Sequence, residues 1–142
     1  MLKPVFRAGD TYAIDPDIRR EDALAYGTAE HSYVAELNGA AVGTFYIRRN
    51  QKGGGSHISN CGYITARGSE GQGVARAMLT FSLNEAKSLG FDAMQYNFVL
   101  ATNQRAIDTW TRAGFDTIGR IPRAFRLPDG EKTDALIMHR FL

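Results

Sequence analysis

The sequence of 142 residues has little cysteine and no long apolar run. Cys61 is its single cysteine, so no disulfide can form within the chain. The opening residues MLKPVFRAGD contain no apolar stretch like that of a signal peptide, and no run of the chain is long enough to cross a bilayer. We therefore expect a soluble protein of a reducing compartment, the cytoplasm, with no membrane partner.

A strong charge of one sign is also missing. The chain has 17 Lys and Arg against 15 Asp and Glu, a formal net charge of +2. This excess is too small and scattered to predict nucleic acid as a partner, but it does not oppose a polyanionic ligand. With 44% hydrophobic residues, a chain of this length can bury one sizeable core, so we expect a single domain over residues 1–142.

The most informative stretch that is present runs from Asn60 to Leu89. Asn60–Thr65 is rich in aromatic and β-branched residues, which is typical of a strand. From Val74 onward, apolar residues recur at intervals of three and four, which predicts an amphipathic helix that Gly90 ends. The turn between them, GSEGQG, exposes backbone N–H groups beside the unpaired donors of the first helical turn. It therefore predicts a site for a phosphate or pyrophosphate.

Two nucleotide-binding alternatives fit this turn poorly. A nucleoside triphosphate loop requires Gly-Lys followed by Ser or Thr, and neither tripeptide occurs in the sequence. A dinucleotide fingerprint beginning at Gly71 requires a glycine at position 76, where Arg76 stands. A dinucleotide oxidoreductase would also need a second strand-helix repeat, which the sequence lacks.

The remaining segments predict a mixed sheet. The Asn38-Gly39 pair is a strong hairpin signal between two strand-like runs, and a second helix starts at Thr102 or Asn103. The strands expected around these helices are 31–37, 41–48, 57–65, 92–100, 115–121 and 133–141, with a weak helix at 18–26 and loops at 50–56 and 122–132. A strand-helix-strand unit within an otherwise antiparallel chain predicts the α+β class, with a mostly antiparallel mixed sheet and flanking helices.

Two motifs resemble those of the GNAT acetyltransferases. Residues 70–75, EGQGVA, are similar to the Q/R-x-x-G-x-G/A turn of that family, and LATNQRAIDTWTRAGF at 100–115 is similar to its N-x-x-A-x-x-x-Y motif followed by Gly-Phe. The resemblance covers roughly residues 32–142. It implies the acyl-CoA N-acyltransferase fold and an N-acetyltransferase that moves an acetyl group from acetyl-coenzyme A to an amine by direct attack in a ternary complex. A small, amino-acid-like amine is the expected acceptor.

The resemblance also implies the residues that hold the cosubstrate. The main chain of Ile64, Thr65 and Ala66 would pair with the pantetheine arm, and an N–H group there would stabilise the oxyanion. The pyrophosphate would lie on the turn and the first residues of the helix: Gly71, Gln72, Gly73, Val74, Ala75 and Arg76. Asn103, and Asn97 on the preceding strand, would contribute from the other side. We expect no metal.

The chain departs from the family pattern at several positions. Glu70 stands where the family has Gln or Arg, with Arg67 nearby as a source of positive charge. Trp110 stands where many members have a tyrosine that protonates the leaving thiolate; an indole cannot do so, and we expect a core aromatic residue. Met1–Gly9 looks like the tail of the family's first helix, so we expect the first strand of the family to be missing.

The family's usual acidic general base is missing too, because residues 56–66 contain no Asp or Glu. The candidates that remain are His57, whose ordinary pKa suits the task, and a water held by Asn60 and Tyr63. The run GSHISN, together with Asn60, Asn97 and Asn103, resembles a smaller GNAT group that acetylates proline analogues such as azetidine-2-carboxylate. That resemblance implies that these asparagines position the acceptor and the acetyl group.

Other hypotheses stay open at this point. We expect Asn60 to contact the far end of the acceptor, with Arg123 or Arg126 as the neighbouring cation. A double-displacement route through Cys61 is disfavoured, because no histidine adjoins this thiol in the sequence. A catalytically silent acyl-coenzyme A binding module and a protein N-acetyltransferase are the alternative functions, and a homodimer is compatible with the sequence.

Overall fold

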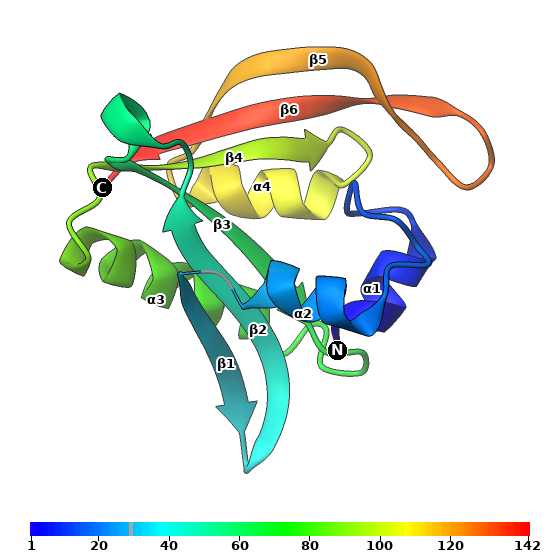
Figure 1. Cartoon of the computed structure of the whole chain (residues 1–142), viewed down its shortest axis with the longest axis horizontal. Helices are drawn as coiled ribbons and strands as arrows, with labels where there is room; N and C mark the ends of the chain where they lie inside the picture. The colour runs from blue at the N-terminus through cyan, green and yellow to red at the C-terminus, as the bar shows by residue number, and fades with distance from the viewer. Residues whose placement is uncertain (29) are drawn as a thin grey trace.

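The computed structural model describes residues 1–28 and 30–142 of the chain. Within these residues, one mixed sheet has the strand order β1-β2-β3-β4-β6-β5 (Figure 1). The strands are β1 His31–Leu37, β2 Ala40–Arg49, β3 Ile58–Thr65, β4 Ala93–Leu100, β5 Asp116–Arg126 and β6 Lys132–Phe141. The helices are α1 Leu2–Ala8, α2 Arg20–Gly27, α3 Val74–Ser88 and α4 Gln104–Arg112, with a 3₁₀ turn at Gly53–Gly55.

The pairing of the strands confirms the α+β prediction. β3 and β4 are parallel, while β1 with β2, β2 with β3, β4 with β6 and β5 with β6 are antiparallel. Helix α3 forms the crossover between the two parallel strands, as parallel pairing requires. The order of elements predicted from His31 onward is confirmed.

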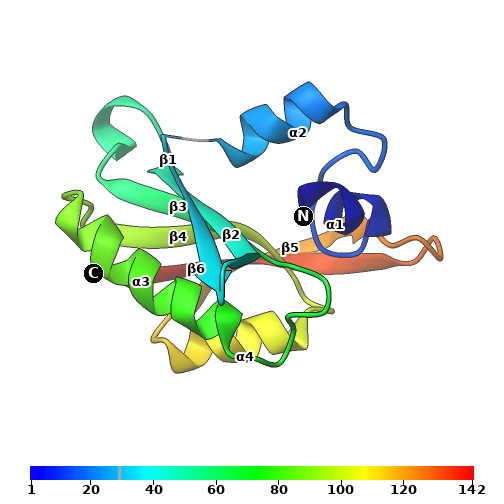
Figure 2. The same cartoon turned by 90° about the horizontal axis from the view of Figure 1, so that it is seen from below.

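The helices cover opposite faces of the sheet: α1 and α2 lie on one face, and α3 and α4 on the other (Figure 2). Helix α3 buries Met78 and Leu79 in the main core, where β2 approaches it closely. A Cβ atom on Gly43 would lie 2.7 Å from the sulfur of Met78, so a side chain here would have to displace Met78. A smaller core on the other face joins Phe6 of α1 to Ile64 of β3. We call the two faces the α3/α4 side and the α1/α2 side.

The edge strand β5 differs from the prediction. We expected a loop from Pro122 to Lys132, but β5 continues to Arg126 with an irregular register between Ile121 and Phe125. Proline is tolerated in an edge strand, because one side of that strand needs no ladder donor. Arg123 has a φ of 52°, and its N–H group donates to the Asp134 carboxylate at 2.8 Å.

The described residues before His31 form α1 and α2 and no strand. None of the helices in the described part of the chain has the length and apolar character needed to cross a bilayer.

Candidate active site

The two parallel strands in the middle of the sheet separate soon after they meet. β3 and β4 are in register only at Ile58 with Ala93 and Ser59 with Met94. One residue further on, the Asn60 side-chain amide donates to the Gln95 carbonyl at 2.9 Å. Beyond that bond the strands diverge, as Figure 1 shows. The facing main-chain groups of the later residues are therefore not used by a β3–β4 ladder.

Alternation along β3 decides which of its main-chain groups face this split. The Ile58 carbonyl accepts from the Asn50 N–H group at 2.8 Å, and the Ala66 N–H group donates to Val42 at 2.8 Å. Even-numbered residues of β3 therefore bond to β2, and the main chain of odd-numbered residues faces β4. Of the three residues expected to pair with a pantetheine arm, only Thr65 meets this condition. The Ala66 N–H group is already bonded to β2. Ile64 is also an even-numbered residue, so its main-chain groups face β2 as well.

The split opens into a cleft of about 1310 Å³. On the α3/α4 side, the cleft is lined by the glycine-rich turn, by residues of α3 from Val74 to Asn84 and by one face of α4. On the α1/α2 side, its lining includes Tyr12, Tyr26, Tyr46 and Arg48. The opening between the separated strands thus joins two spaces that are lined by different kinds of residues.

The glycine-rich turn has the geometry of an anion site. Gly71 and Gly73 have φ values of 79° and 81°, and no atom lies within 4 Å of where either Cβ would be. The backbone ladder of α3 begins with the Ala77 N–H group, which donates to the Gly73 carbonyl at 2.9 Å. The N–H groups of Val74 and Ala75 therefore precede the ladder at the positive end of the helix dipole.

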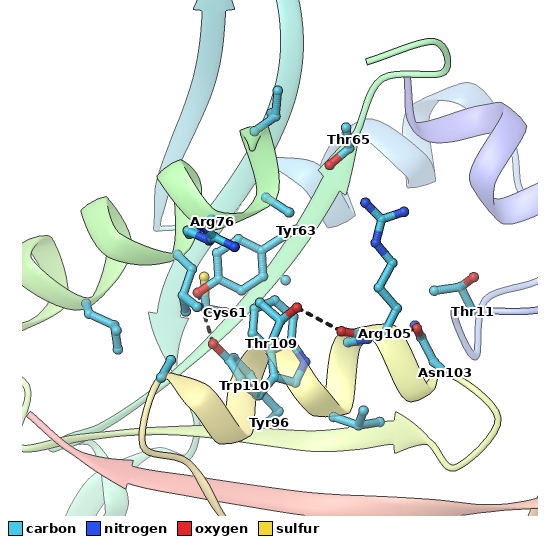
Figure 3. Close-up of a pocket in the computed structure, with 18 of the residues that line it drawn as sticks. Thr11, Cys61, Tyr63, Thr65, Arg76, Tyr96, Asn103, Arg105, Thr109 and Trp110 are labelled. Carbon is cyan, nitrogen blue, oxygen red and sulfur yellow. Dashed lines mark hydrogen bonds between the residues drawn. The ribbon is translucent and has the colours of Figure 1, made fainter. Parts of the chain in front are cut away.

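Arginine side chains add positive charge around this turn. Arg76 on α3 and Arg105 on α4 both line the cleft, and Figure 3 shows Arg105 extending from α4 in the direction of Thr65. Arg67, the expected substitute for the missing family cation, is exposed and is not among the lining residues. Of the two arginines that flank the turn in sequence, Arg76 and not Arg67 lines the cleft.

Glu70 bonds to the turn itself. Its carboxylate accepts from the Gly68 N–H group at 2.7 Å, while the Gln72 side-chain amide donates to the Gly68 carbonyl at 3.2 Å. Both side chains therefore brace the loop, and Glu70 places a negative charge at the edge of the cleft. Gln72, expected as a binding residue, contributes its main chain to the turn while its side chain points back to Gly68.

A cluster of hydroxyl groups forms the floor of the cleft on the α3/α4 side. The Tyr63 hydroxyl lies 3.0 Å from that of Tyr96 and 2.6 Å from that of Ser82. The indole of Trp110 lies over both tyrosines, with ring centroids 5.2 Å and 5.0 Å apart (Figure 3). Burial raises the pKa of both phenols well above the ordinary value, so they stay protonated at neutral pH.

Cys61 lies close to this cluster, but its thiol is protected. The residue is only 5% exposed, and burial raises the pKa of its thiol to about 12. A thiol in this state contains very little thiolate at neutral pH, and the thiolate is the nucleophile. The geometry therefore weighs against a double-displacement route through Cys61.

The α1/α2 side contains a different arrangement, centred on Asn60. The Asn60 side-chain oxygen accepts from the Tyr46 hydroxyl at 3.2 Å, and the Tyr26 and Tyr46 hydroxyls lie 3.3 Å apart. Arg48, the register partner of Asn60 on β2, holds its guanidinium 4.6 Å from the ring centroid of Tyr46. The Tyr12 hydroxyl donates to the Tyr63 carbonyl at 2.6 Å within the split.

Comparison with known proteins identifies the family. Residues 4–115 match the model of the acetyltransferase (GNAT) family, which is most of the chain. The chain belongs to the GNAT acetyltransferases. It is 30% identical over 141 residues to N-acetyltransferase aca1 of Schizosaccharomyces pombe, an alignment that spans 87% of this chain and 68% of that protein. The chain is therefore an N-acetyltransferase of the α+β fold that this family shares.

Solved structures agree with this assignment. A GCN5-related N-acetyltransferase from Kribbella flavida superposes with a TM-score of 0.92 at 32% identity, over 99% of this chain and 87% of that one. A GNAT acetyltransferase from Streptococcus pneumoniae has a TM-score of 0.83 at 20% identity, over 99% and 89% of the two chains, and shows the shared fold.

Three residues that the sequence singled out lie in different places in this acetyltransferase. Asn103 lines the cleft and caps α4, where its side-chain oxygen accepts from the Ala106 N–H group at 3.2 Å. Asn97 donates to the Asn50 side chain at 2.6 Å. It reaches the cleft from β4, where alternation puts it on the face opposite to Tyr96. His57 is exposed in the turn before β3 and is not among the residues lining the cleft.

Sequence reasoning missed the aromatic residues and the arginine of the α1/α2 side. Tyr12, Tyr26 and Tyr46 come from separate segments and carry no motif. Arg48 could have been predicted from the sequence, because the register of the hairpin and the meander places it opposite Asn60. The expected cations Arg123 and Arg126 are instead exposed on β5 and do not line the cleft.

Proposed function

We propose that this N-acetyltransferase uses acetyl-coenzyme A to acetylate a small amine that carries a carboxylate, by direct attack in a ternary complex. The observation that carries the proposal is Arg48, a half-buried cation in the cleft on the side opposite to the anion cradle. The ion pairs among the described residues do not include it. An arginine held on aromatic rings without an acidic partner is suited to a carboxylate ligand.

The α3/α4 side fits coenzyme A. The open main chain of Gly71 and Gly73 and the first N–H groups of α3 suit a pyrophosphate, with Arg76 beside them. The pantetheine arm would run along the edge of β3, where the main chain of Thr65 and Tyr63 faces the split. An N–H group on this edge would stabilise the negative charge that develops on the carbonyl oxygen during attack.

The α1/α2 side fits the acceptor. Arg48 would hold the carboxylate, while Asn60 and the hydroxyl of Tyr26 lie beside it as polar contacts. The acceptor nitrogen would then point through the split between β3 and β4 toward the thioester. Fixing both reactants on opposite faces of one opening supplies most of the acceleration, because amines attack thioesters readily once they are neutral.

Deprotonation of the acceptor would proceed through water. None of the described residues that line the cleft on the α1/α2 side carries a carboxylate or an imidazole. A relay through Asn60 and Tyr63 is unfavourable. Alternation along β3 sends the two side chains to opposite faces, and the Asn60 amide is bonded to Gln95 and Tyr46. The acceptor would therefore bind in its neutral form, which is the minor form of an amine in solution. After attack, the extra proton on the nitrogen would pass to solvent.

The test compares matched acceptors. Turnover is measured with a panel of amino acids and with their amidated and decarboxylated counterparts. The wild-type enzyme should prefer the carboxylate member of each pair by at least about tenfold. Arg48→Gln should abolish that preference and leave the affinity for acetyl-coenzyme A unchanged. Arg49→Gln is the matched control, because the neighbouring arginine is exposed and paired with Glu30.

Two outcomes would contradict the proposal. Equal turnover of the charged and uncharged members of each pair would remove Arg48 from the acceptor site. Tight binding of acetyl-coenzyme A without thiol release for any amine would favour the silent binding module instead.

A further inference from the structure

The hydrogen bonds on the α1/α2 side of the cleft have a fixed direction. The Asn60 amide nitrogen donates to the Gln95 carbonyl, so the Asn60 oxygen faces Tyr46 and accepts from its hydroxyl at 3.2 Å. The Tyr46 proton is thus committed, and the Tyr26 hydroxyl, 3.3 Å away, must donate to Tyr46. The Tyr26 oxygen is the end of this chain of donors, and its lone pairs can accept from a ligand.

The polar groups around this chain are neutral. Burial raises the pKa of Tyr12 and of Tyr46 far above the ordinary value, so both phenols keep their protons. Asn60 and Asn97, which also line the cleft, carry uncharged amides. Arg48 therefore supplies the charge on this side of the described cleft lining, and that charge is positive.

The acidic residues of the neighbouring elements do not offset Arg48. Those of α2 and of the segment before it are exposed and do not line the cleft: Asp10, Asp15, Asp17, Glu21 and Asp22. Two carboxylates line the cleft from the α3/α4 side, and both are bonded there. Glu70 accepts from the Gly68 N–H group at 2.7 Å, and Asp108 accepts from the Gln104 amide at 2.7 Å. The other charged residues of the described lining are arginines: Arg76, Arg105, Arg112 and Arg140.

We propose that Arg48 promotes the loss of a proton from the acceptor's amine, in addition to holding its carboxylate. This inference rests on the proposed function. In an amino acid the ammonium group is stabilised by the carboxylate beside it, and a guanidinium paired with that carboxylate opposes this stabilisation. The neutral oxygen of Tyr26 replaces it only in part. An N–H bond of the ammonium then breaks, its electron pair stays on nitrogen and the proton passes to water, which leaves the nitrogen ready to attack the thioester.

The size of the effect follows from the distance between the charges. A guanidinium that binds the carboxylate of an amino acid lies about 6 Å from the amine nitrogen, and a unit charge at that distance in a half-buried site changes a pKa by about one unit. The bound amine should therefore lose its proton about one pH unit lower than the free amine. At neutral pH this shift increases the neutral fraction of the bound acceptor about tenfold.

The first measurement is the pH dependence of kcat at saturating acetyl-coenzyme A and amino acid, because kcat reports ionisations within the complex. In the wild type, the amine should titrate about one unit below its pKa in free solution. Arg48→Gln should remove this shift and lower kcat about tenfold at pH 7, and the difference should vanish above the pKa of the free amine. A residue that only positions the acceptor would lose the same factor at every pH, and that result overturns the proposal.

Two further variants test whether the charge is responsible. Arg48→Lys keeps the charge but not the planar guanidinium, so it should weaken acceptor binding and retain most of the shift in the amine pKa. Arg49→Gln removes the neighbouring exposed arginine, which is paired with Glu30, and should leave kcat and its pH dependence as in the wild type. Loss of the shift in Arg48→Lys would also overturn the proposal.

The second measurement does not depend on turnover. The amino acid of the panel with the highest kcat/KM, labelled with ¹³C next to its nitrogen, is titrated by NMR in the dead-end complex of the wild-type enzyme with coenzyme A. We expect a bound-amine pKa about one unit below that of the free amino acid, and an equal or higher value overturns the proposal. If coenzyme A does not bind, or acceptors with a carboxylate are not preferred, the proposed function fails. If that preference holds and the amine pKa is unshifted, this inference alone fails.

Discussion

The two sides of the split sheet are built in different ways. The α3/α4 side uses main-chain groups of one continuous stretch, the end of β3, the glycine-rich turn and the start of α3. The α1/α2 side uses side chains from segments far apart in sequence: Tyr12, Tyr26, Arg48 and Asn60. A site made of main-chain donors requires only the right backbone shape, whereas a site made of side chains depends on each residue type.

Under the proposed function, this difference would allow one fold to keep the same cosubstrate while the acceptor changes. Backbone N–H groups at a helix start recognise an anion whatever the surrounding side chains are. In the proposed function, the contacts around Arg48 would in contrast select the acceptor by charge and shape, and they would change with single substitutions. Changes on the α3/α4 side should therefore act on cosubstrate affinity alone, and those on the α1/α2 side on the acceptor alone.

The largest expected effect is that of Gly73→Val. The φ of 81° at Gly73 is unfavourable for a β-branched residue, and the new side chain would fill the open space in front of the first N–H groups of α3. We expect the affinity for acetyl-coenzyme A to fall by at least about 100-fold, measured by titration calorimetry. The folded state should remain, because nothing lies within 4 Å of the added Cβ.

The matched control is Gly90→Val at the opposite end of α3. Gly90 has a φ of 88° and equally open surroundings, so the backbone strain is comparable. Its variant should lose about 1 to 3 kcal/mol of stability, as Gly73→Val does, but bind acetyl-coenzyme A like the wild type. Equal loss of affinity in both variants would mean that strain in α3, and not a blocked cradle, is responsible.

The second expected effect is that of Asn60→Ala. The change leaves the Gln95 carbonyl and the Tyr46 hydroxyl without their partner, so the free energy of unfolding should fall by about 1 to 3 kcal/mol. The kcat/KM for the acceptor should fall by one to two orders of magnitude, about 1.4 to 2.8 kcal/mol, while cosubstrate affinity stays constant. Steady-state kinetics at saturating acetyl-coenzyme A gives this value.

Ser59→Ala is the control that separates a loss of stability from a loss of acceptor kcat/KM. Ser59 is fully buried on the same strand, and its hydroxyl donates to the Ala93 carbonyl at 3.0 Å, also across β3 and β4. It does not line the cleft. Its variant should lose stability and keep the acceptor kcat/KM; a loss equal to that of Asn60→Ala would reduce Asn60 to a structural link between the strands.

The features that the sequence predicts are local ones, and the features that it does not predict depend on contacts between distant segments. The hairpin at Asn38-Gly39, the turn before α3 and the cap at Asn103 are local features, and each lies where the sequence placed it. The early separation of β3 from β4 was not predictable, because it depends on where two distant strands stop pairing. The place of Arg48 depends on that separation. His57, expected from its residue type alone, lies outside the cleft, because residue type without strand register does not locate a side chain.

The smallest expected effect tests whether a surface ion pair supports the α1/α2 side. Glu30, which follows α2, bonds to the Arg49 guanidinium at 2.8 Å, and this bond lowers the pKa of the Glu30 carboxyl. The stabilisation is therefore present above the ordinary carboxyl pKa and is lost as the pH falls through the lowered folded-state value. With exposed fractions of 39% for Glu30 and 55% for Arg49, solvent screens the ion pair, so its contribution to stability should be small.

Glu30→Gln should accordingly lower the denaturation midpoint slightly at neutral pH, and the difference from wild type should disappear in acid. The acceptor KM should stay within twofold of wild type, because Tyr26 is held by ring contacts with Phe6 at 5.6 Å and with Tyr12 at 6.4 Å. Denaturant titrations at several pH values, combined with acceptor kinetics, measure both quantities. A larger rise in KM would mean that the exposed pair, and not the aromatic cluster, positions the acceptor side.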